Sequence, residues 1–315
     1  MDRLKLSVNI VTFNSAADIE ACLTSLDCQT FHNFRIQLLD NASSDDTVQR
    51  VGSRNAEVIR STKNLGFAAA HNRLIRENQS EFILVLNPDT VLRETFLEEI
   101  VRALDGRPDA GSASGKLLRM DGITIDSTGI MMLRSQRHLD RGAGHPDLGQ
   151  FDTPEDIFGP SGAAALYRRT ALEDAAVEGE YFDENFFAYR EDADLAWRLR
   201  LFGWNSIYVP TAVALHRRRV TPERRTQLPV AINYHSVKNR FLLRINNMTS
   251  ALYLRDFWRI TARDAAVVGY VFLKEWSSAP ALGYVLRNLP RLWRKRQTIQ
   301  KRIRIQPEEL ARWFT

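Results

Sequence analysis

Strand-sized and helix-sized blocks of hydrophobic residues alternate along the first part of the chain. The run from Phe82 to Leu86 is entirely apolar and contains no Gly or Pro, which predicts a strand buried on both faces of a sheet. Residues 6–13, 34–39 and 56–60 predict three further strands. Apolar residues at i, i+3, i+4 and i+7 between positions 19 and 26 predict an amphipathic helix. Strands that alternate with helices indicate an α/β fold with a mainly parallel, wound sheet flanked by helices.

Polar side chains follow each of the four predicted strands at the point where the strand ends. Because the carboxyl ends of parallel strands meet at one edge of a sheet, these side chains are expected to lie close together and to outline a nucleotide site. They are Thr12 and Asn14, Asp40 and Asn41, Lys63 and Asn64, and Asn87 and Asp89. The chain has no Gly-x-Gly-x-x-Gly and no Walker A run, so neither a dinucleotide-binding fold nor a P-loop is supported.

The turn Asn87-Pro88-Asp89 presents a carboxylate at this edge of the sheet. Pro88 has no N–H donor and stops the strand. With the amide of Asn87 beside it, the Asp89 carboxylate is suited to hold a hard divalent cation and to leave positions open for phosphate oxygens. The alternative is an ordinary turn whose Asp caps a helix predicted from Arg93 to Leu104.

Two stretches of the second half carry candidate chemistry. A loop of small residues from Gly162 to Ala164 would let a ligand approach the backbone closely, although close packing of a strand on a helix also explains it. Glu191, Asp192 and Asp194 occupy the first turn of a predicted helix. The helix dipole favours acids at that end, so capping is a sufficient explanation for any one of them.

Composition narrows the class of protein. With 315 residues, of which 44% are hydrophobic and 26% charged, the chain is typical of a soluble globular protein, and disorder, collagen and a disulfide scaffold are excluded. Met1 to Leu6 runs directly into a strand, so no signal peptide is expected. Cys22 and Cys28 lack metal-binding spacing and fit a reducing compartment.

The basic character of the chain is concentrated in its C-terminal part. Residues 241–315 contain 14 Lys and Arg against 5 Asp and Glu, interspersed with aromatic residues. The longest apolar run, Ala265 to Leu273, is too short to span a bilayer. The pattern favours either amphipathic helices that lie on a membrane surface or a helical lid that packs its aromatics on the preceding domain, and both can hold. Nucleic acid is a poorer partner, because no recognition motif occurs.

The chain resembles the inverting glycosyltransferases of family 2, which have the GT-A fold. The resemblance spans roughly residues 5–240 and rests on four segments in the family's order. They are Ser7 to Asn14, Leu39 to Thr47, Asn64 to Asn72 and Leu86 to Asp89. The fourth segment lies where the family carries its Asp-x-Asp metal motif. Asn87 replaces the first Asp, which is similar to the rhamnosyltransferase-like branch. Residues 233–243 resemble the helix with Tyr and Arg-Asn that follows the family's catalytic domain.

The resemblance implies roles for the residues at matching positions. Asp192 takes the role of general base, and Asp89 holds a divalent metal (Mg²⁺ or Mn²⁺), with His216 as a second ligand unless it is an ordinary core or surface side chain. The nucleotide sugar is expected to contact Thr12, Asn14, Asp40, Asn41, Lys63, Asn64, Phe67, Asn72 and Asn87. The acceptor is expected to contact Gly162, Ala163, Glu191 and Trp197.

The expected organisation is a GT-A catalytic domain over residues 1–240 and a basic helical extension over 241–315. Within the catalytic domain, about residues 1–105 form the nucleotide-sugar half and 106–240 the acceptor and base half. The expected activity is inverting transfer of a sugar to a saccharide in cell-surface polysaccharide synthesis. The favoured donor is dTDP-rhamnose, and the favoured acceptor is polyprenyl-linked. The protein is expected in the cytoplasm, peripheral at the inner face of the membrane, and both a monomer and a homo-oligomer are compatible with the sequence.

Three other functions fit the sequence less well. A processive polysaccharide synthase of the same fold would carry a Gln-x-x-Arg-Trp motif and spanning helices, whereas Arg312-Trp313 follows Gln306 at the wrong spacing. A catalytically inactive nucleotide-binding scaffold tethered to the membrane would not need Asp192, Asp89 and His216 together. A nucleotidyltransferase would carry a Gly-rich activation loop with Arg and Lys, which is missing.

Overall fold

A ten-stranded mixed sheet forms the centre of the molecule. The computed structural model describes residues 4–219 and 228–315. The strand order is β10-β12-β6-β11-β4-β1-β2-β3, with β5 paired to β12 and β7 paired to β6, and β8 and β9 form a separate pair. The strands are β1 (Leu6–Thr12), β2 (Phe34–Asp40), β3 (Ala56–Arg60), β4 (Phe82–Leu86), β5 (Thr90–Leu92), β6 (Ala110–Arg119), β7 (Ile125–Ser127), β8 (Ile130–Met132), β9 (His138–Asp140), β10 (Glu155–Asp156), β11 (Ala164–Arg168) and β12 (Asn205–His216).

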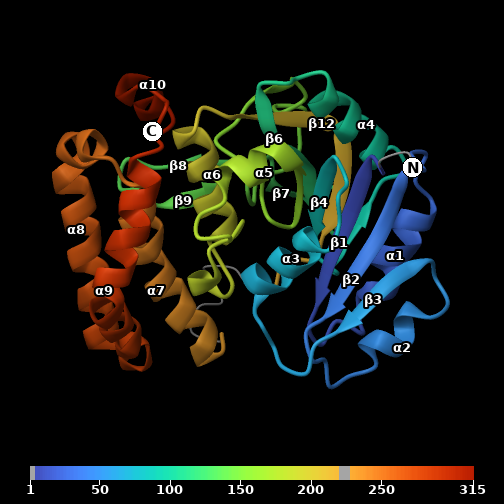
Figure 1. Cartoon of the computed structure of the whole chain (residues 1–315), viewed down its shortest axis with the longest axis horizontal. Coiled ribbons are helices and arrows are strands. Elements are labelled where there is room, and N and C mark those ends of the chain that lie inside the picture. Colours follow the sequence, from blue (N-terminus) through green and yellow to red (C-terminus); the bar gives the residue numbers. More distant parts are fainter. Residues whose placement is uncertain (1–3, 220–227) are drawn as a thin grey trace.

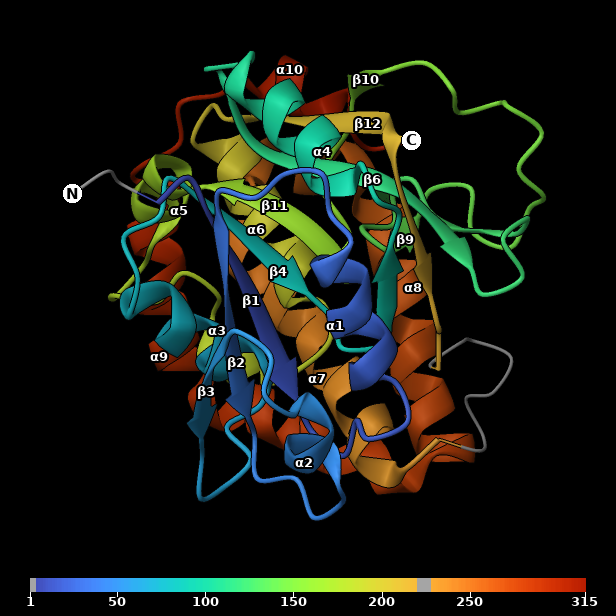
Figure 2. The same cartoon turned by 90° about the vertical axis from the view of Figure 1, so that its right-hand side faces the viewer.

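The predicted wound α/β sheet is confirmed. Strands β3, β2, β1 and β4 are parallel neighbours, and each of the four strands predicted in this half is present within a residue of its expected bounds. Strand β11 joins the two halves, because it pairs antiparallel with β4 on one side and with β6 on the other. The carboxyl ends of β1, β2, β3 and β4 therefore lie along one edge of the sheet, as their parallel pairing requires (Figure 2).

Helices cover both faces of the sheet and extend beyond one of them (Figure 1). Side chains of α1 and α4 pack against one face, and side chains of α3, α5, α6 and the C-terminal helices pack against the other. The helices are α1 (Ile19–Asp27), α2 (Thr47–Val51), α3 (Phe67–Arg76), α4 (Phe96–Asp105), α5 (Arg169–Ala175), α6 (Glu191–Leu201), α7 (Val230–Asn247), α8 (Ser250–Lys274), α9 (Ala279–Gln300) and α10 (Pro307–Ala311), with short 3₁₀ turns at η1 (Glu184–Phe186) and η3 (Trp276–Ser278).

Strand β4 explains why its sequence is apolar throughout. Phe82, Leu84 and Leu86 point into the core shared with α1 and α4, whereas Ile83 and Val85 point into the core shared with α3 and α6. Because both faces are covered, every side chain of this strand is buried.

The structure corrects the prediction for the segment after Asp89. The short strand β5 occupies Thr90–Leu92, and helix α4 begins at Phe96, three residues later than the expected Arg93. Thr95, not Asp89, is the residue before the first turn of α4. The alternative in which Asp89 caps that helix is therefore wrong.

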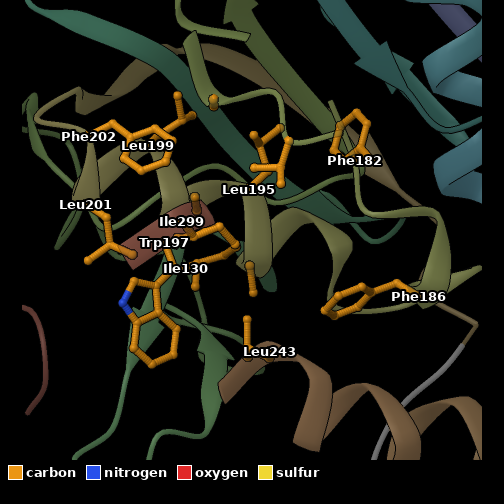
Figure 3. Packing of buried hydrophobic residues seen from close by; sticks show 14 of the residues in the cluster. Ile130, Phe182, Phe186, Leu195, Trp197, Leu199, Leu201, Phe202, Leu243 and Ile299 are labelled. Atoms are coloured by element: carbon orange, nitrogen blue, oxygen red, sulfur yellow. The ribbon is translucent and has the colours of Figure 1, made fainter. Parts of the chain in front are cut away.

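The C-terminal helices pack on the domain that carries the sheet. Figure 3 shows Leu243 of α7 and Ile299 of α9 together with Leu195, Trp197 and Leu199 of α6. Helix α7 runs without interruption through residue 240, where the charge pattern divides the chain. Of residues 4–219 and 228–315, none belongs to a helix with both the length and the apolar character needed to cross a membrane.

Candidate active site

The ends of β1 and β2 are joined by a buried hydrogen bond. The Thr12 hydroxyl donates to Asp40 Oδ1 over 3.1 Å, and Oδ2 of Asp40 accepts the backbone N–H of Ser43 over 3.2 Å. Asn14 follows β1 with a φ of 51°, and its Oδ1 accepts the N–H of Ser44 over 2.8 Å. These bonds fix the first two loops of the predicted nucleotide rim against each other.

A second pair of loops is joined by Asn41. Its Nδ2 donates to Asn64 Oδ1 over 2.9 Å, and its Oδ1 accepts the N–H of Leu65 over 2.7 Å. Lys63 is exposed beside this junction, and Phe67 begins helix α3. The structure thus brings together the polar residues that follow β1, β2 and β3, although several of them use their side chains to shape the loops.

Asn72, expected to contact the nucleotide sugar, and Trp197, expected to contact the acceptor, both have fully buried side chains. Asn72 is fully buried, and its amide binds the backbone of Phe182 through both ends. Trp197 is also fully buried and packs against Phe158 and Phe314. We therefore correct both assignments: Asn72 anchors helix α3, and Trp197 anchors helix α6 from within the core.

Asp89 faces His216 from the neighbouring part of the sheet. The Asp89 turn and the end of β12 are held together by a backbone bond from Arg217 N–H to the Asp89 carbonyl over 3.0 Å. His216 Nε2 lies 3.3 Å from Asp89 Oδ1. That oxygen is buried and accepts no hydrogen bond of good geometry from the described residues. The carboxylate therefore retains capacity for another ligand.

The other side of His216 contacts a carboxylate that the sequence analysis missed. His216 Nδ1 lies 2.7 Å from Asp126 Oδ2, and Asp126 is fully buried. Arg218 in turn pairs with Asp126 over 2.7 Å and with Asp140 over 2.7 Å. Burial alone would lower the pKa of His216, but the hydrogen bond to Asp126 and the ion-pair contact with Asp89 outweigh burial and raise the pKa to about 9. The position of the His216 imidazole, between Asp89 and Asp126, thus favours a positively charged group.

The donor set fits a divalent cation that is completed by its substrate. A carboxylate oxygen of Asp89 and an imidazole nitrogen of His216 suit Mn²⁺ or Mg²⁺, and Asp126 would orient the imidazole from behind. In the described part of the chain, no three His, Cys, Asp or Glu side chains gather in an arrangement that would hold a metal ion by themselves. The remaining ligands would therefore come from water and from diphosphate oxygens.

Asp192 is fixed at the start of helix α6 by backbone donors. Its Oδ2 accepts the N–H of Gly162 over 3.0 Å, and its Oδ1 accepts the N–H of Ala193 over 2.7 Å. Burial raises the pKa of Asp192, the bond from Gly162 opposes that rise, and the charge of Asp140 adds to it. Gly162 leaves room for this contact, because an added Cβ would lie 3.3 Å from the Asp192 carboxylate.

The Asp89 turn and Asp192 meet on either side of one loop. The Ala163 carbonyl accepts the N–H of Asn87 over 2.9 Å, while the neighbouring Gly162 donates to Asp192. Asp140 and Arg218 are also close enough to Asp192 to shift its pKa. Arg218 pairs with Asp126 and Asp140, so its charge acts on Asp192 as well as on the carboxylate behind His216. The backbone of Gly162 and Ala163 thus links Asp192 to the turn that presents Asp89, and a shared site for the two acids stays a prediction.

Glu191 differs from Asp192 in its surroundings. Burial, followed by the charge of Asp192, raises the pKa of Glu191 to about 8. Its Oε2 is buried and finds no hydrogen-bond partner among residues 4–219 and 228–315. The Glu191 carboxyl is therefore protonated at neutral pH.

This fold is that of the GT-A glycosyltransferases. Residues 7–175 match the family described as Glycosyl transferase family 2, and the chain belongs to that family. It is 31% identical over 243 residues to an N-acetylglucosaminyl-diphospho-decaprenol L-rhamnosyltransferase of Mycobacterium tuberculosis. The matched residues make up 68% of this chain and 76% of that protein. A poly-beta-1,6-N-acetyl-D-glucosamine synthase of Staphylococcus epidermidis is 22% identical over 221 residues, or 66% of this chain and 48% of that protein.

Solved structures share the fold at low sequence identity. TarS residues 1–349 of S. aureus, in complex with UDP-GlcNAc, is 17% identical with a TM-score of 0.60, over 94% of this chain and 90% of that one. The mannosyltransferase PcManGT of Pyrobaculum calidifontis, in complex with GDP-Man and Mn²⁺, is 16% identical with a TM-score of 0.55, over 98% and 85% of the two chains.

We expect Asp126→Asn to weaken Mn²⁺ binding about 10- to 100-fold, because the imidazole of His216 would lose the carboxylate that orients it. Free Mn²⁺ is measured by electron paramagnetic resonance during a titration in the presence of dTDP. Asp121→Asn, at an exposed turn of the same segment, serves as the matched control. An unchanged Mn²⁺ affinity in Asp126→Asn would contradict a role behind the metal ligand.

We expect Glu191→Gln to stabilise the protein increasingly as the pH rises from about 5 to about 8. The folded protein holds the Glu191 proton more tightly than the unfolded chain, whose glutamates have a pKa near 4.5, so wild-type stability falls as pH rises through this window. The difference in free energy of unfolding between variant and wild type should grow by about 1 kcal/mol per pH unit. This difference is measured by denaturant unfolding at several pH values, with Glu94→Gln at an exposed position as control. A difference in free energy of unfolding that stays constant with pH argues against a raised pKa of Glu191.

Proposed function

We propose that this glycosyltransferase moves rhamnose from dTDP-rhamnose to a hydroxyl of a polyprenyl-linked saccharide, with inversion at the anomeric carbon. The observation that carries the proposal is a pair of adjacent backbone bonds: Gly162 donates to the Asp192 carboxylate, and Ala163 accepts from Asn87 in the turn that presents Asp89. The mycobacterial relative, which is named for rhamnosyl transfer to a diphospho-decaprenol-linked sugar, supports the choice of donor and acceptor class.

Asp192 performs the proton transfer in this proposal. A sugar hydroxyl is a weak nucleophile until its proton is removed, and the raised pKa of Asp192 makes its carboxylate a better proton acceptor. The acceptor oxygen forms a bond to the anomeric carbon as the bond to the diphosphate breaks, and the proton passes to Asp192. One displacement inverts the configuration, so no covalent sugar intermediate on the protein is needed.

The leaving diphosphate lies at the opposite side of the loop. Asp89 and His216 would hold a divalent cation there, and such a cation neutralises charge that develops on the departing oxygen. We place the nucleoside at the rim formed by Thr12, Asp40 and Asn41, with Asn14, Lys63, Asn64, Phe67 and Asn87 around it. We place the acceptor beside Gly162, Ala163 and Glu191.

A surface of the C-terminal helices suits an anionic membrane. After a kink at Asp256, helix α8 presents an outward stripe at spacings of four and three residues, opposite its buried Ile260 and Val271. The stripe contains Trp258, Ala262, Ala265, Gly269 and Phe272. Trp258 is 79% exposed, which is unusual for a side chain of this size. An apolar stripe that faces outward needs a partner such as a lipid interface.

Helix α9 carries a comparable stripe with basic neighbours. Its exposed apolar residues at i, i+3 and i+7 are Leu286, Leu289 and Trp293. Exposed arginines lie beside them at positions 287, 291 and 294. Trp and Arg at one surface match the acyl boundary and the anionic headgroups of a bilayer. We therefore propose that the protein works at the cytoplasmic face of the membrane, where a lipid-linked acceptor would be available.

We expect Asp192→Asn to lower the rate of transfer from dTDP-rhamnose by about 10²- to 10⁴-fold while donor affinity is retained, because the variant loses the proton acceptor and keeps the donor site. Transfer is measured with a polyprenyl-diphosphate-GlcNAc acceptor, and donor affinity by calorimetry. Asp105→Asn, at an exposed position, is the control. Wild-type turnover in Asp192→Asn would refute the assignment of the base, and binding of dTDP-rhamnose without turnover in the wild type would favour a scaffold.

We expect the double variant Trp258→Ser/Leu273→Ser to lose most of its binding to phosphatidylglycerol vesicles in a sedimentation assay, because two exposed apolar side chains no longer enter the lipid interface. Leu148→Ser is the matched control, since Leu148 and Leu273 are both 81% exposed but Leu148 lies outside the C-terminal helices. An equal loss of binding in the control speaks against this membrane surface. So does a wild-type protein that, in low salt, binds phosphatidylglycerol vesicles no more strongly than phosphatidylcholine vesicles.

A further inference from the structure

The segment that leads into helix α6 has an unusual backbone. Phe187, Tyr189 and Arg190 have φ angles of 66°, 71° and 74°, in the left-handed region that residues with a Cβ rarely adopt. Asp192 follows two residues after Arg190. The direction in which α6 starts, and therefore the position of the Asp192 carboxylate, depends on this segment keeping its conformation.

One buried side chain from α7 holds the segment. Asn239 Nδ2 donates to the carbonyls of Phe186, Ala188 and Tyr189 over 2.9, 2.7 and 2.7 Å. Two hydrogens are thus shared among three carbonyls of a single tight turn. Asn239 is fully buried. If the amide were removed, the three carbonyls would lose these hydrogen bonds. The strained conformation of the segment would then be less favoured.

The opposite side of the segment contacts the donor half of the protein. The N–H of Ala68 donates to the Phe187 carbonyl over 3.2 Å. Gly66 packs so closely on Phe187 that an added Cβ would lie 2.5 Å from its ring. Gly66 belongs to the loop that contains Asn64, one of the expected nucleotide contacts. The segment is therefore enclosed between the donor loop on one side and helix α7 on the other.

We propose that Asn239 is a positioning residue for the general base: its amide holds the turn from Phe186 to Tyr189, and the turn directs Asp192 toward Gly162 and the acceptor. The residue does not touch substrate. Asn239 lies near the end of the expected catalytic domain, in helix α7, which continues through residue 247 into the C-terminal extension. This inference rests on the role of Asp192 in the proposed function.

The test separates the chemical step from donor binding. We expect Asn239→Ala to lower kcat by about 10- to 100-fold, measured with dTDP-rhamnose and polyprenyl-diphosphate-GlcNAc at saturation, while the calorimetric affinity for dTDP-rhamnose changes less than about threefold. Asn239→Asp should be at least as impaired, because a carboxylate would face three carbonyl oxygens. Hydrogen exchange of the amides from Phe187 to Ala193 should accelerate in both variants.

Asn78→Ala controls for the loss of a buried amide in general. Asn78 is also buried, but it binds Gln37 and the Leu74 carbonyl at the other end of the sheet. We expect it to lower thermal stability and to leave kcat near the wild-type value. A wild-type kcat in a folded Asn239→Ala protein overturns the positioning role, as does an equal fall of kcat in Asn78→Ala. If wild type does not use dTDP-rhamnose, or Asp192→Asn remains active, the proposed function fails first and independently.

Discussion

The candidate active site depends on Gly162 and Ala163, the two residues that precede β11. Their backbone connects the end of β4 with the start of α6. Ala163 accepts the N–H of Asn87, and Gly162 donates to Asp192. These bonds are made by the backbone, so they do not depend on the rotamer of a long side chain. They set the distance between the Asp89 turn, which comes from the parallel half of the sheet, and Asp192, which comes from the mixed half. A larger residue at position 162 would push directly on the carboxylate.

Helix α6 is also fixed from its far side by the C-terminal helices. Asn247 donates to Asp194 over 2.7 Å, and Asn246 donates to Asp183 over 2.9 Å. Lys295 of α9 pairs with Asp183 over 2.9 Å in the same buried cluster. Truncating one partner of such a cluster leaves an unpaired buried charge, which is costly. Residues beyond position 240 therefore support the start of helix α6 and the segment before it, even though the outer surfaces of the C-terminal helices carry a separate basic and apolar pattern.

The sequence was a good guide wherever local pattern decides structure. The four N-terminal strands and the start of α6 at Glu191 follow from hydrophobic periodicity and polar strand ends. A motif gives the position of a residue in the chain but not the direction of its side chain. Asn72 and Trp197 were therefore expected to contact ligands, although both side chains are buried in the protein. Asp126 was not identified, and Asn239 was given no role although it lies in the segment 233–243 that resembles the family. The partners of these two residues lie 90 and about 50 positions away, and local sequence does not predict such contacts.

The three acids at the start of α6 are sorted into different states by their surroundings. Glu191 has no partner for Oε2 in the described structure and keeps its proton near neutral pH, because burial and the nearby charge raise its pKa to about 8. Asp194 is committed to Arg198 at 2.9 Å. Asp192 receives two backbone N–H groups, which stabilise its ionised form against burial. Because a protonated Glu191 adds no second negative charge, Asp192 can remain an ionised and comparatively basic carboxylate, which is the state that proton removal from an acceptor hydroxyl requires.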